Sequence, residues 1–176
     1  LLDHFHLPTK NILLYALNPL IIIELGGNLH FEAAMVFFLL TAVFFLIKNK
    51  MTLSAFSITL SIASKLLPLM FLPFLIKRLG WKKSIQYFTI VGVVIVLLFA
   101  PLLSGAFLTN FGASLDLYFQ KFEFNASIYY AIRWVGYQVV GYNWIQSAGP
   151  ALAMIVLLGI LTVTFLEKNF NWKNLF

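Results

Sequence analysis

The sequence lacks cysteine altogether and contains little charge of either sign. Without a thiol, the chain has no disulfide, no cysteine nucleophile and no cysteine ligand for a metal. Charged residues make up only 10% of the 176 residues, whereas they form about a quarter of an ordinary soluble domain. This shortage excludes a disordered chain and argues strongly against a soluble globular one.

Apolar residues are present in excess: 61% of the chain is hydrophobic, and the mean hydropathy is +0.93. The net charge of +6 comes from basic residues in short clusters between apolar runs, as on the cytoplasmic side of membrane proteins. These clusters form no continuous stripe that could follow a phosphate backbone, so we expect no nucleic-acid partner. We predict an all-α, polytopic transmembrane helical bundle whose main partner is the lipid bilayer.

The apolar runs define the expected membrane segments of a single domain over residues 1–176. The first run is short for a membrane span and contains Asn18 and Pro19. It is expected either to be the last part of a longer membrane helix or to be kinked, because proline removes a backbone donor. Because the chain begins at Leu1 and not at a methionine, we expect it to be a piece of a longer protein. The predicted segments are residues 11–25, 31–47, 53–64 with 69–76, 84–103 and 149–166.

One region does not fit a single span. Residues 51–76 contain Lys65 and are bounded by basic clusters on both sides, and the positive-inside rule places both clusters in the cytoplasm. We therefore predict a broken, re-entrant-like hairpin in which 53–64 rises, the chain turns near Lys65, and 69–76 returns. A broken helix in a membrane needs protein or water around its freed backbone, so Lys65 is expected to lie deep and turned inward.

Residues 104–148 are more polar than the rest and are predicted to form extracytoplasmic amphipathic helices. In one of them, four apolar or aromatic residues recur at helical spacing and form a stripe. A second helix is expected to start at Asn125, a residue type that caps helix N-termini well. The stripe consists of Leu115, Tyr118, Phe119 and Phe122.

Two carboxylates, an amide and an imidazole lie within nine residues, and we treat them as a candidate substrate-binding cluster: Glu24, Asn28, His30 and Glu32. Ionisable groups at membrane depth are usually functional. The alternative is a polar connection between helices, with Glu32 favoured by the dipole of the helix that it starts. One histidine and two glutamates at this spacing match no recognised ligand set, so no metal is expected.

Two cations are candidates for binding a phosphate. An ammonium group at the depth predicted for Lys65 costs a few kcal/mol on insertion scales. An anionic partner would offset this cost, and it could be a lipid phosphate or a carboxylate such as Glu24. The planar guanidinium of Arg133 suits a phosphate, although the neighbouring tyrosines and tryptophan also fit an anchor at the membrane surface.

Three stretches, in this order along the chain, resemble motifs of the polytopic GT-C glycosyltransferases. They are closest to the bacterial polyprenyl-phosphate-mannose-dependent mannosyltransferases. The first stretch runs from Asn18-Pro19 through Glu24 to Gly27-Asn28, His30 and Glu32. The others are Ser64-Lys65-Leu66-Leu67-Pro68 with Pro73, and Phe124-Asn125-Ala126-Ser127-Ile128-Tyr129-Tyr130 with Arg133.

The resemblance implies a multi-pass enzyme of a bacterial inner or plasma membrane. It would transfer a sugar from a polyprenyl-phosphate-linked donor to a glycan or glycolipid acceptor on the extracytoplasmic face, without a cofactor. Lys65 and Arg133 would then contact the donor phosphate, and the cluster from Glu24 to Glu32 would bind sugar hydroxyls or support the site. The family's catalytic carboxylate is expected upstream of Leu1, so the catalytic residue is unknown and this piece alone is expected to be inactive.

Two other functions stay open on the sequence. A secondary transporter also uses broken helices and an intramembrane cation at its substrate site. A non-catalytic membrane subunit would use the same apolar helices only to pack against partners.

Overall fold

The computed structural model describes residues 1–27, 31–120 and 127–166, and its regular elements in these ranges are all helical. The chain forms two compact units, Leu1–Leu98 and Phe99–Phe176. Among these described residues, two helices are long and apolar enough to cross a membrane, and a third span results if the bent pair Pro19–Gly27 and Glu32–Ile47 is counted as one. The all-helical membrane fold is therefore confirmed, while the membrane boundaries of each segment stay predictions.

The first unit begins with short helical pieces, as the proline predicted. They are η1 (Thr9–Asn11), α1 (Ile12–Ala16), α2 (Pro19–Ile21) and the π-helical turn η2 (Ile22–Gly27). The interruption falls at Asn18, whose side-chain oxygen accepts a hydrogen bond from the backbone N–H of Leu20 at 2.9 Å. Asn18 is thus the N-cap of α2 and Pro19 its first residue, a position where a missing N–H costs nothing.

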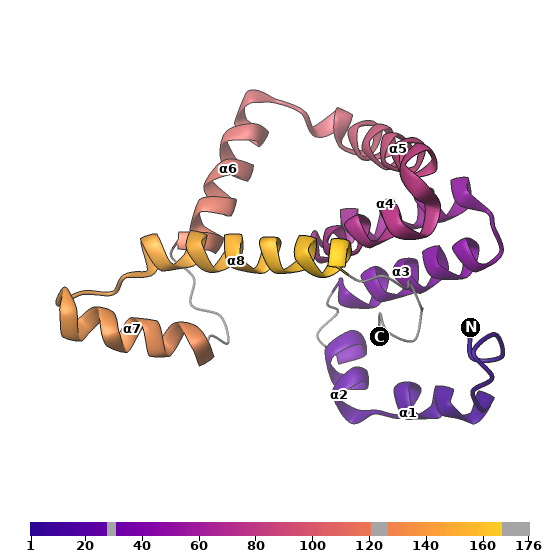
Figure 1. Ribbon diagram of the computed structural model, residues 1–176, viewed down its shortest axis with the longest axis horizontal. Helices are drawn as coiled ribbons and strands as arrows, with labels where there is room; N and C mark the ends of the chain where they lie inside the picture. The colour runs from indigo at the N-terminus through magenta and orange to yellow at the C-terminus, as the bar shows by residue number, and fades with distance from the viewer. Residues whose placement is uncertain (28–30, 121–126, 167–176) are drawn as a thin grey trace. The chain divides into compact units, whose positions relative to one another are not determined.

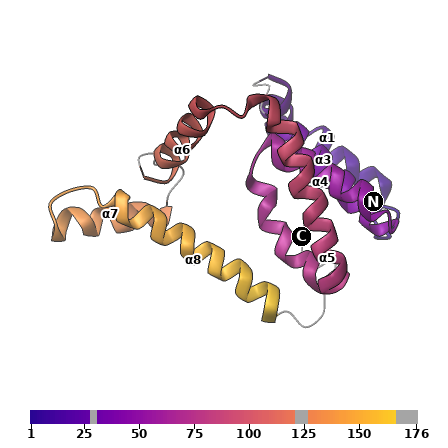
Figure 2. The same cartoon turned by 90° about the horizontal axis from the view of Figure 1, so that it is seen from above.

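Helices α3 (Glu32–Ile47) and α4 (Met51–Ser64) form an antiparallel hairpin, and they lie side by side in Figures 1 and 2. Ser54 Oγ donates a hydrogen bond to the carbonyl oxygen of Ala42 at 2.8 Å, and Ser61 Oγ donates one to that of Met35 at 2.7 Å. Small side chains let two helices approach closely, and their hydroxyls satisfy polar groups that lipid cannot. These two bonds fix the register of the hairpin.

The chain breaks again after α4, where Lys65 has extended backbone angles (φ −160°, ψ 138°). The 3₁₀ helix η3 (Leu67–Phe71) follows and leads into α5 (Leu72–Phe99). Helix α5 is itself interrupted at Gly80, with φ 74° and ψ 162°.

At Gly80 the chain folds back. Ser84 Oγ donates a hydrogen bond to the carbonyl oxygen of Leu75 at 3.3 Å, whereas nine residues of uninterrupted helix would rise about 13.5 Å. The arm before Gly80 therefore returns toward the α3–α4 turn, and the arm after it leads away again. The break expected near Lys65 and the return of the chain after it are confirmed, and Gly80 marks the reversal expected between segments 69–76 and 84–103, while the placement of the hairpin in the membrane stays a prediction.

The second unit contains η4 (Ala100–Leu102), α6 (Gly105–Gln120), α7 (Ser127–Val139) and α8 (Ile145–Leu166). Ser104 Oγ accepts a hydrogen bond from the backbone N–H of Phe107 at 3.1 Å and so caps α6. Helix α8 contacts both α6 and α7. Two helices in the polar region were predicted and are present, although Phe122 and Asn125, which were assigned to them, lie outside the described residues.

Candidate functional site

An ion pair joins two of the predicted site residues: Lys65 Nζ donates a hydrogen bond to Glu32 Oε1. Glu32 is the first residue of α3, and Lys65 directly follows α4. Because the two helices are antiparallel, the start of α3 and the end of α4 meet at the same end of the hairpin. The side chains keep 33% and 44% of their surface exposed, respectively, so both groups are accessible.

Lys65 pairs with Glu32, and the expectation that named Glu24 as an example of its carboxylate partner was wrong. The partner follows from the register that the serine hydroxyls of α4 set against α3. Glu24 is half-buried in the turn Ile22–Gly27. Glu32 also occupies the first turn of α3, where the N-terminal end of the helix dipole favours a carboxylate.

Asn28 and His30, the other two members of the predicted cluster, lie outside the described residues. Of the four, the structure therefore brings Glu32 into contact with a predicted cation. In the described part of the chain, no three histidine, aspartate or glutamate side chains gather in a way that could hold a metal ion.

Arg133, the second predicted phosphate contact, belongs to α7 in the other unit. Its guanidinium carbon lies 5.0 Å from the centroid of the Tyr130 ring, which is a cation–π geometry. Nearby, the Tyr129 hydroxyl donates a hydrogen bond to Asn143 Oδ1 in the α7–α8 connection. The described contacts of Arg133 thus show a cation supported by an aromatic ring, and its role as a phosphate contact or a membrane anchor stays a prediction.

The Glu32–Lys65 pair offers two kinds of chemistry at one accessible point. The ammonium group can bind an anion, and the carboxylate can hold the ammonium in place or accept a hydrogen bond from a hydroxyl. A lysine ammonium has three N–H donors, and Glu32 is its hydrogen-bond partner among the described residues. Donors therefore remain for a ligand.

A second polar site, which was not predicted from the sequence, lies at the opposite end of the hairpin. There, Arg78 and Lys83 of α5 line a pocket together with Asn49 and Gln86. These cations were interpreted only as markers of the cytoplasmic side. The signal available in the sequence was that two basic clusters flank the predicted hairpin and must meet where its ends meet.

Comparison with known proteins identifies the first part of the chain. Residues 4–80 match the sequence model of the MptA/B family, described as alpha-(1->6)-mannopyranosyltransferase, N-terminal domain. The match covers less than half of the chain, and it includes both Glu32 and Lys65 and ends at the break in α5. No curated protein and no solved structure matches the chain.

Proposed function

We propose that the chain is part of an integral-membrane mannosyltransferase. In this proposal it takes mannose from a polyprenyl-phosphate-linked donor and transfers it to a glycan or glycolipid acceptor on the extracytoplasmic face. The sugar follows from the mannosyltransferase domain that residues 4–80 match. The observation that carries the proposal is the accessible Glu32–Lys65 ion pair within this matched stretch.

Lys65 is proposed to bind the donor phosphate. Negative charge grows on that phosphate as the glycosidic bond breaks, and a positioned cation stabilises the transition state. Glu32 is proposed as a positioning residue, because its carboxylate holds the ammonium at the end of the hairpin. Arg133 is proposed as a second phosphate contact, and Glu24, Asn28 and His30 are proposed to contact sugar hydroxyls.

The hairpin geometry supports the extracytoplasmic face. Lys48 and Lys50 lie at the turn between α3 and α4, the end that the positive-inside rule assigns to the cytoplasm. The Glu32–Lys65 pair lies at the other end of α3, whose sixteen residues span about 24 Å. A site at that end would face the side on which lipid-linked sugars are consumed in this proposal.

The substitution Lys65→Met tests the proposal in the full-length protein that contains this chain, reconstituted in lipid vesicles. Binding of polyprenyl-phosphate mannose is measured first, because binding needs only the contacts to the donor, and transfer of mannose is measured second. Loss of one charge-assisted contact should weaken binding roughly tenfold to a hundredfold. Lys50→Met is the matched control, since Lys50 is an exposed lysine at the other end of the hairpin, and it should bind the donor like the wild type.

Wild-type donor binding by a Lys65→Met protein with unchanged helix content would contradict the phosphate role. The product separates the remaining alternatives. A mannosylated acceptor supports an enzyme, whereas uptake of a solute without any new glycosidic bond would support a transporter.

A further inference from the structure

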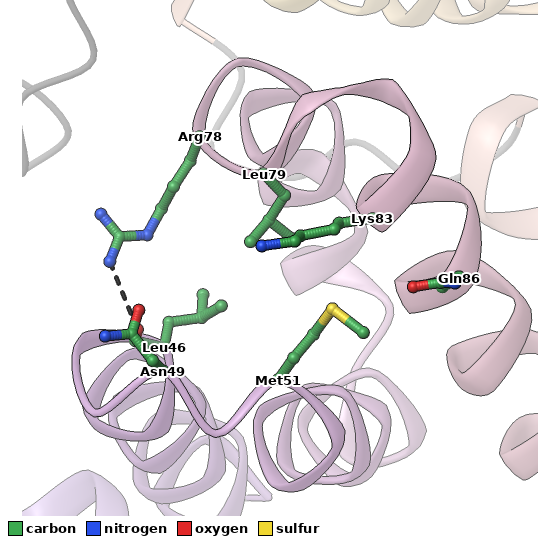
Figure 3. Close-up of a pocket in the computed structure, with 7 residues that line it drawn as sticks. All are labelled: Leu46, Asn49, Met51, Arg78, Leu79, Lys83 and Gln86. Atoms are coloured by element: carbon green, nitrogen blue, oxygen red, sulfur yellow. Dashed lines mark hydrogen bonds between the residues drawn. The ribbon is translucent and has the colours of Figure 1, made fainter.

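A basic pocket of about 470 Å³ lies at the end of the α3–α4 hairpin opposite the Glu32–Lys65 pair. Three segments build it: the α3–α4 turn and the two arms of α5 on either side of Gly80. Figure 3 shows the side chains of Arg78 and Lys83 extending from α5 into the space beside that turn. The lining residues are Leu46, Asn49, Met51, Arg78, Leu79, Lys83 and Gln86.

The fold places the two cations on one pocket. Because the chain folds back at Gly80, residues on both arms of α5 lie beside the same turn. Arg78 Nη2 donates a hydrogen bond to the carbonyl oxygen of Leu46 at 3.3 Å, which ties the first arm of α5 to the end of α3. Asn49 closes the turn in a left-handed conformation (φ 57°), which asparagine tolerates better than most residues.

The residues that line the pocket carry a net positive charge. The lining contains two cations and two side-chain amides and no acidic residue. Within the described residues, Lys83 has no carboxylate partner. A concave surface of one sign concentrates ions of the other sign. Arginine offers a planar fork to phosphate oxygens, and lysine adds a compact charge.

The apolar side chains in the lining point to a lipid as the source of the phosphate. Leu46, Met51 and Leu79 border the pocket beside its cations, and the surrounding chain carries further lysines at 48, 50, 77 and 82. These charges mark the cytoplasmic end, where the leaflet surface is anionic and basic pockets between helices bind lipid head groups. We propose that this pocket binds the phosphate headgroup of an anionic phospholipid.

Lipid-induced stabilisation tests the proposal, because a ligand that binds the folded state raises the unfolding temperature in a concentration-dependent way. The full chain in detergent is titrated with short-chain phosphatidylglycerol, and unfolding is followed by circular dichroism. Phosphatidylcholine and inorganic phosphate are titrated in parallel. We expect saturable stabilisation by phosphatidylglycerol and much weaker effects of the other two. An equal effect of phosphatidylcholine, or an effect of inorganic phosphate that matches the lipid, would overturn the proposal.

Three variants localise the effect. Lys83→Gln should raise the apparent Kd for phosphatidylglycerol about tenfold, as expected for a lost charge-assisted contact. Lys83→Arg should keep the affinity within about threefold. Lys82→Gln removes the same charge from an exposed neighbour that does not line the pocket, and it should bind like the wild type.

Equal losses in Lys82→Gln and Lys83→Gln would overturn the site, because they would show attraction to general surface charge. Unfolding temperatures without lipid show whether each variant folds, and Lys83→Arg keeps the test valid if Lys83→Gln does not. The test uses no sugar donor, so its outcome is independent of the proposed transferase function.

Discussion

Tyr87 donates a hydrogen bond to Ser54 across the contact between α4 and α5, with 2.9 Å between the two hydroxyl oxygens. Ser54 must be the acceptor of this bond, because it donates its single hydroxyl hydrogen to the carbonyl oxygen of Ala42. Both side chains are fully buried. One serine therefore connects three helices, as donor to α3 and acceptor from α5.

This direction predicts unequal costs for the two truncations. Tyr87→Phe removes a donor while Ser54 keeps its bond to Ala42, so the free energy of unfolding should fall by about 0.5–1.5 kcal/mol. Ser54→Ala leaves the buried Tyr87 hydroxyl without its acceptor and should cost about 1–3 kcal/mol. Unfolding in mixed micelles measures both. Ser57→Ala is the control, because Ser57 bonds only within its own helix, to the carbonyl oxygen of Leu53.

If Tyr87→Phe proves more costly than Ser54→Ala, the assigned direction of the bond is wrong. A cost for Ser57→Ala as large as that for Ser54→Ala would show that loss of any serine in α4 destabilises the chain. The comparison therefore isolates the contact between helices.

The Glu32–Lys65 pair should show a small coupling in a double-mutant cycle. Glu32→Gln and Lys65→Met should each lower stability, and the double variant should lose less than their sum. Because both side chains are substantially exposed, the coupling should be that of a surface pair, about 0.2–1 kcal/mol. The cycle cancels the separate contribution of Glu32 to the helix dipole.

A second cycle, between Glu24 and Lys65, serves as the control for partner identity. Its coupling should be close to zero, since the cation is placed against Glu32. A larger coupling with Glu24 than with Glu32 would contradict the register of the hairpin as well as the pair.

The breaks of the fold could be predicted because single residues mark them. Pro19 removes a backbone donor. The basic clusters on both sides of residues 51–76 require a turn between them, near Lys65, because both are assigned to the cytoplasm. The sequence predicted a cytoplasmic reversal among basic residues, between the returning segment 69–76 and the outward segment 84–103. It did not name Gly80 as the turning residue, because a glycine in the sequence does not tell a bend from close packing.

The sequence could predict single residues of the candidate site, but it could not predict which of them contact one another. Glu32 and Lys65 are 33 residues apart, and their contact depends on how α3 and α4 are aligned. That alignment rests on the bonds of Ser54 and Ser61 to main-chain carbonyls. Serines in an apolar helix carry no sequence signal that specifies which carbonyl they contact. The basic pocket was missed for a different reason, because its cations were interpreted only as markers of the cytoplasmic side.

Substitution of glycine by alanine should have opposite effects at two positions of α5, Gly80 and Gly92. The φ of 74° and ψ of 162° at Gly80 belong to a region that is open essentially to glycine alone, so Gly80→Ala should cost about 1–3 kcal/mol. At Gly92 the helix is regular and a Cβ would meet nothing within 4 Å. Gly92→Ala should therefore be stabilising by about 0.5–1 kcal/mol. Thermal unfolding compares the two, and a neutral Gly80→Ala would contradict the reversal.

The orientation of the chain can be measured directly because it contains no cysteine, so each introduced thiol is the only one. The positive-inside rule places Lys50 and Trp81 in the cytoplasm, and both side chains are exposed. Lys50→Cys and Trp81→Cys should resist a membrane-impermeant maleimide added to intact cells and react once the membrane is opened. Asn110→Cys, in the helix α6 predicted to lie outside, should react in intact cells.

Labelling of Lys50→Cys from outside would reverse the orientation and move the Glu32–Lys65 pair to the cytoplasmic face. If only one of the two cytoplasmic positions were labelled, the ends of the broken hairpin would lie on opposite sides of the membrane, and its predicted re-entrant topology would be wrong.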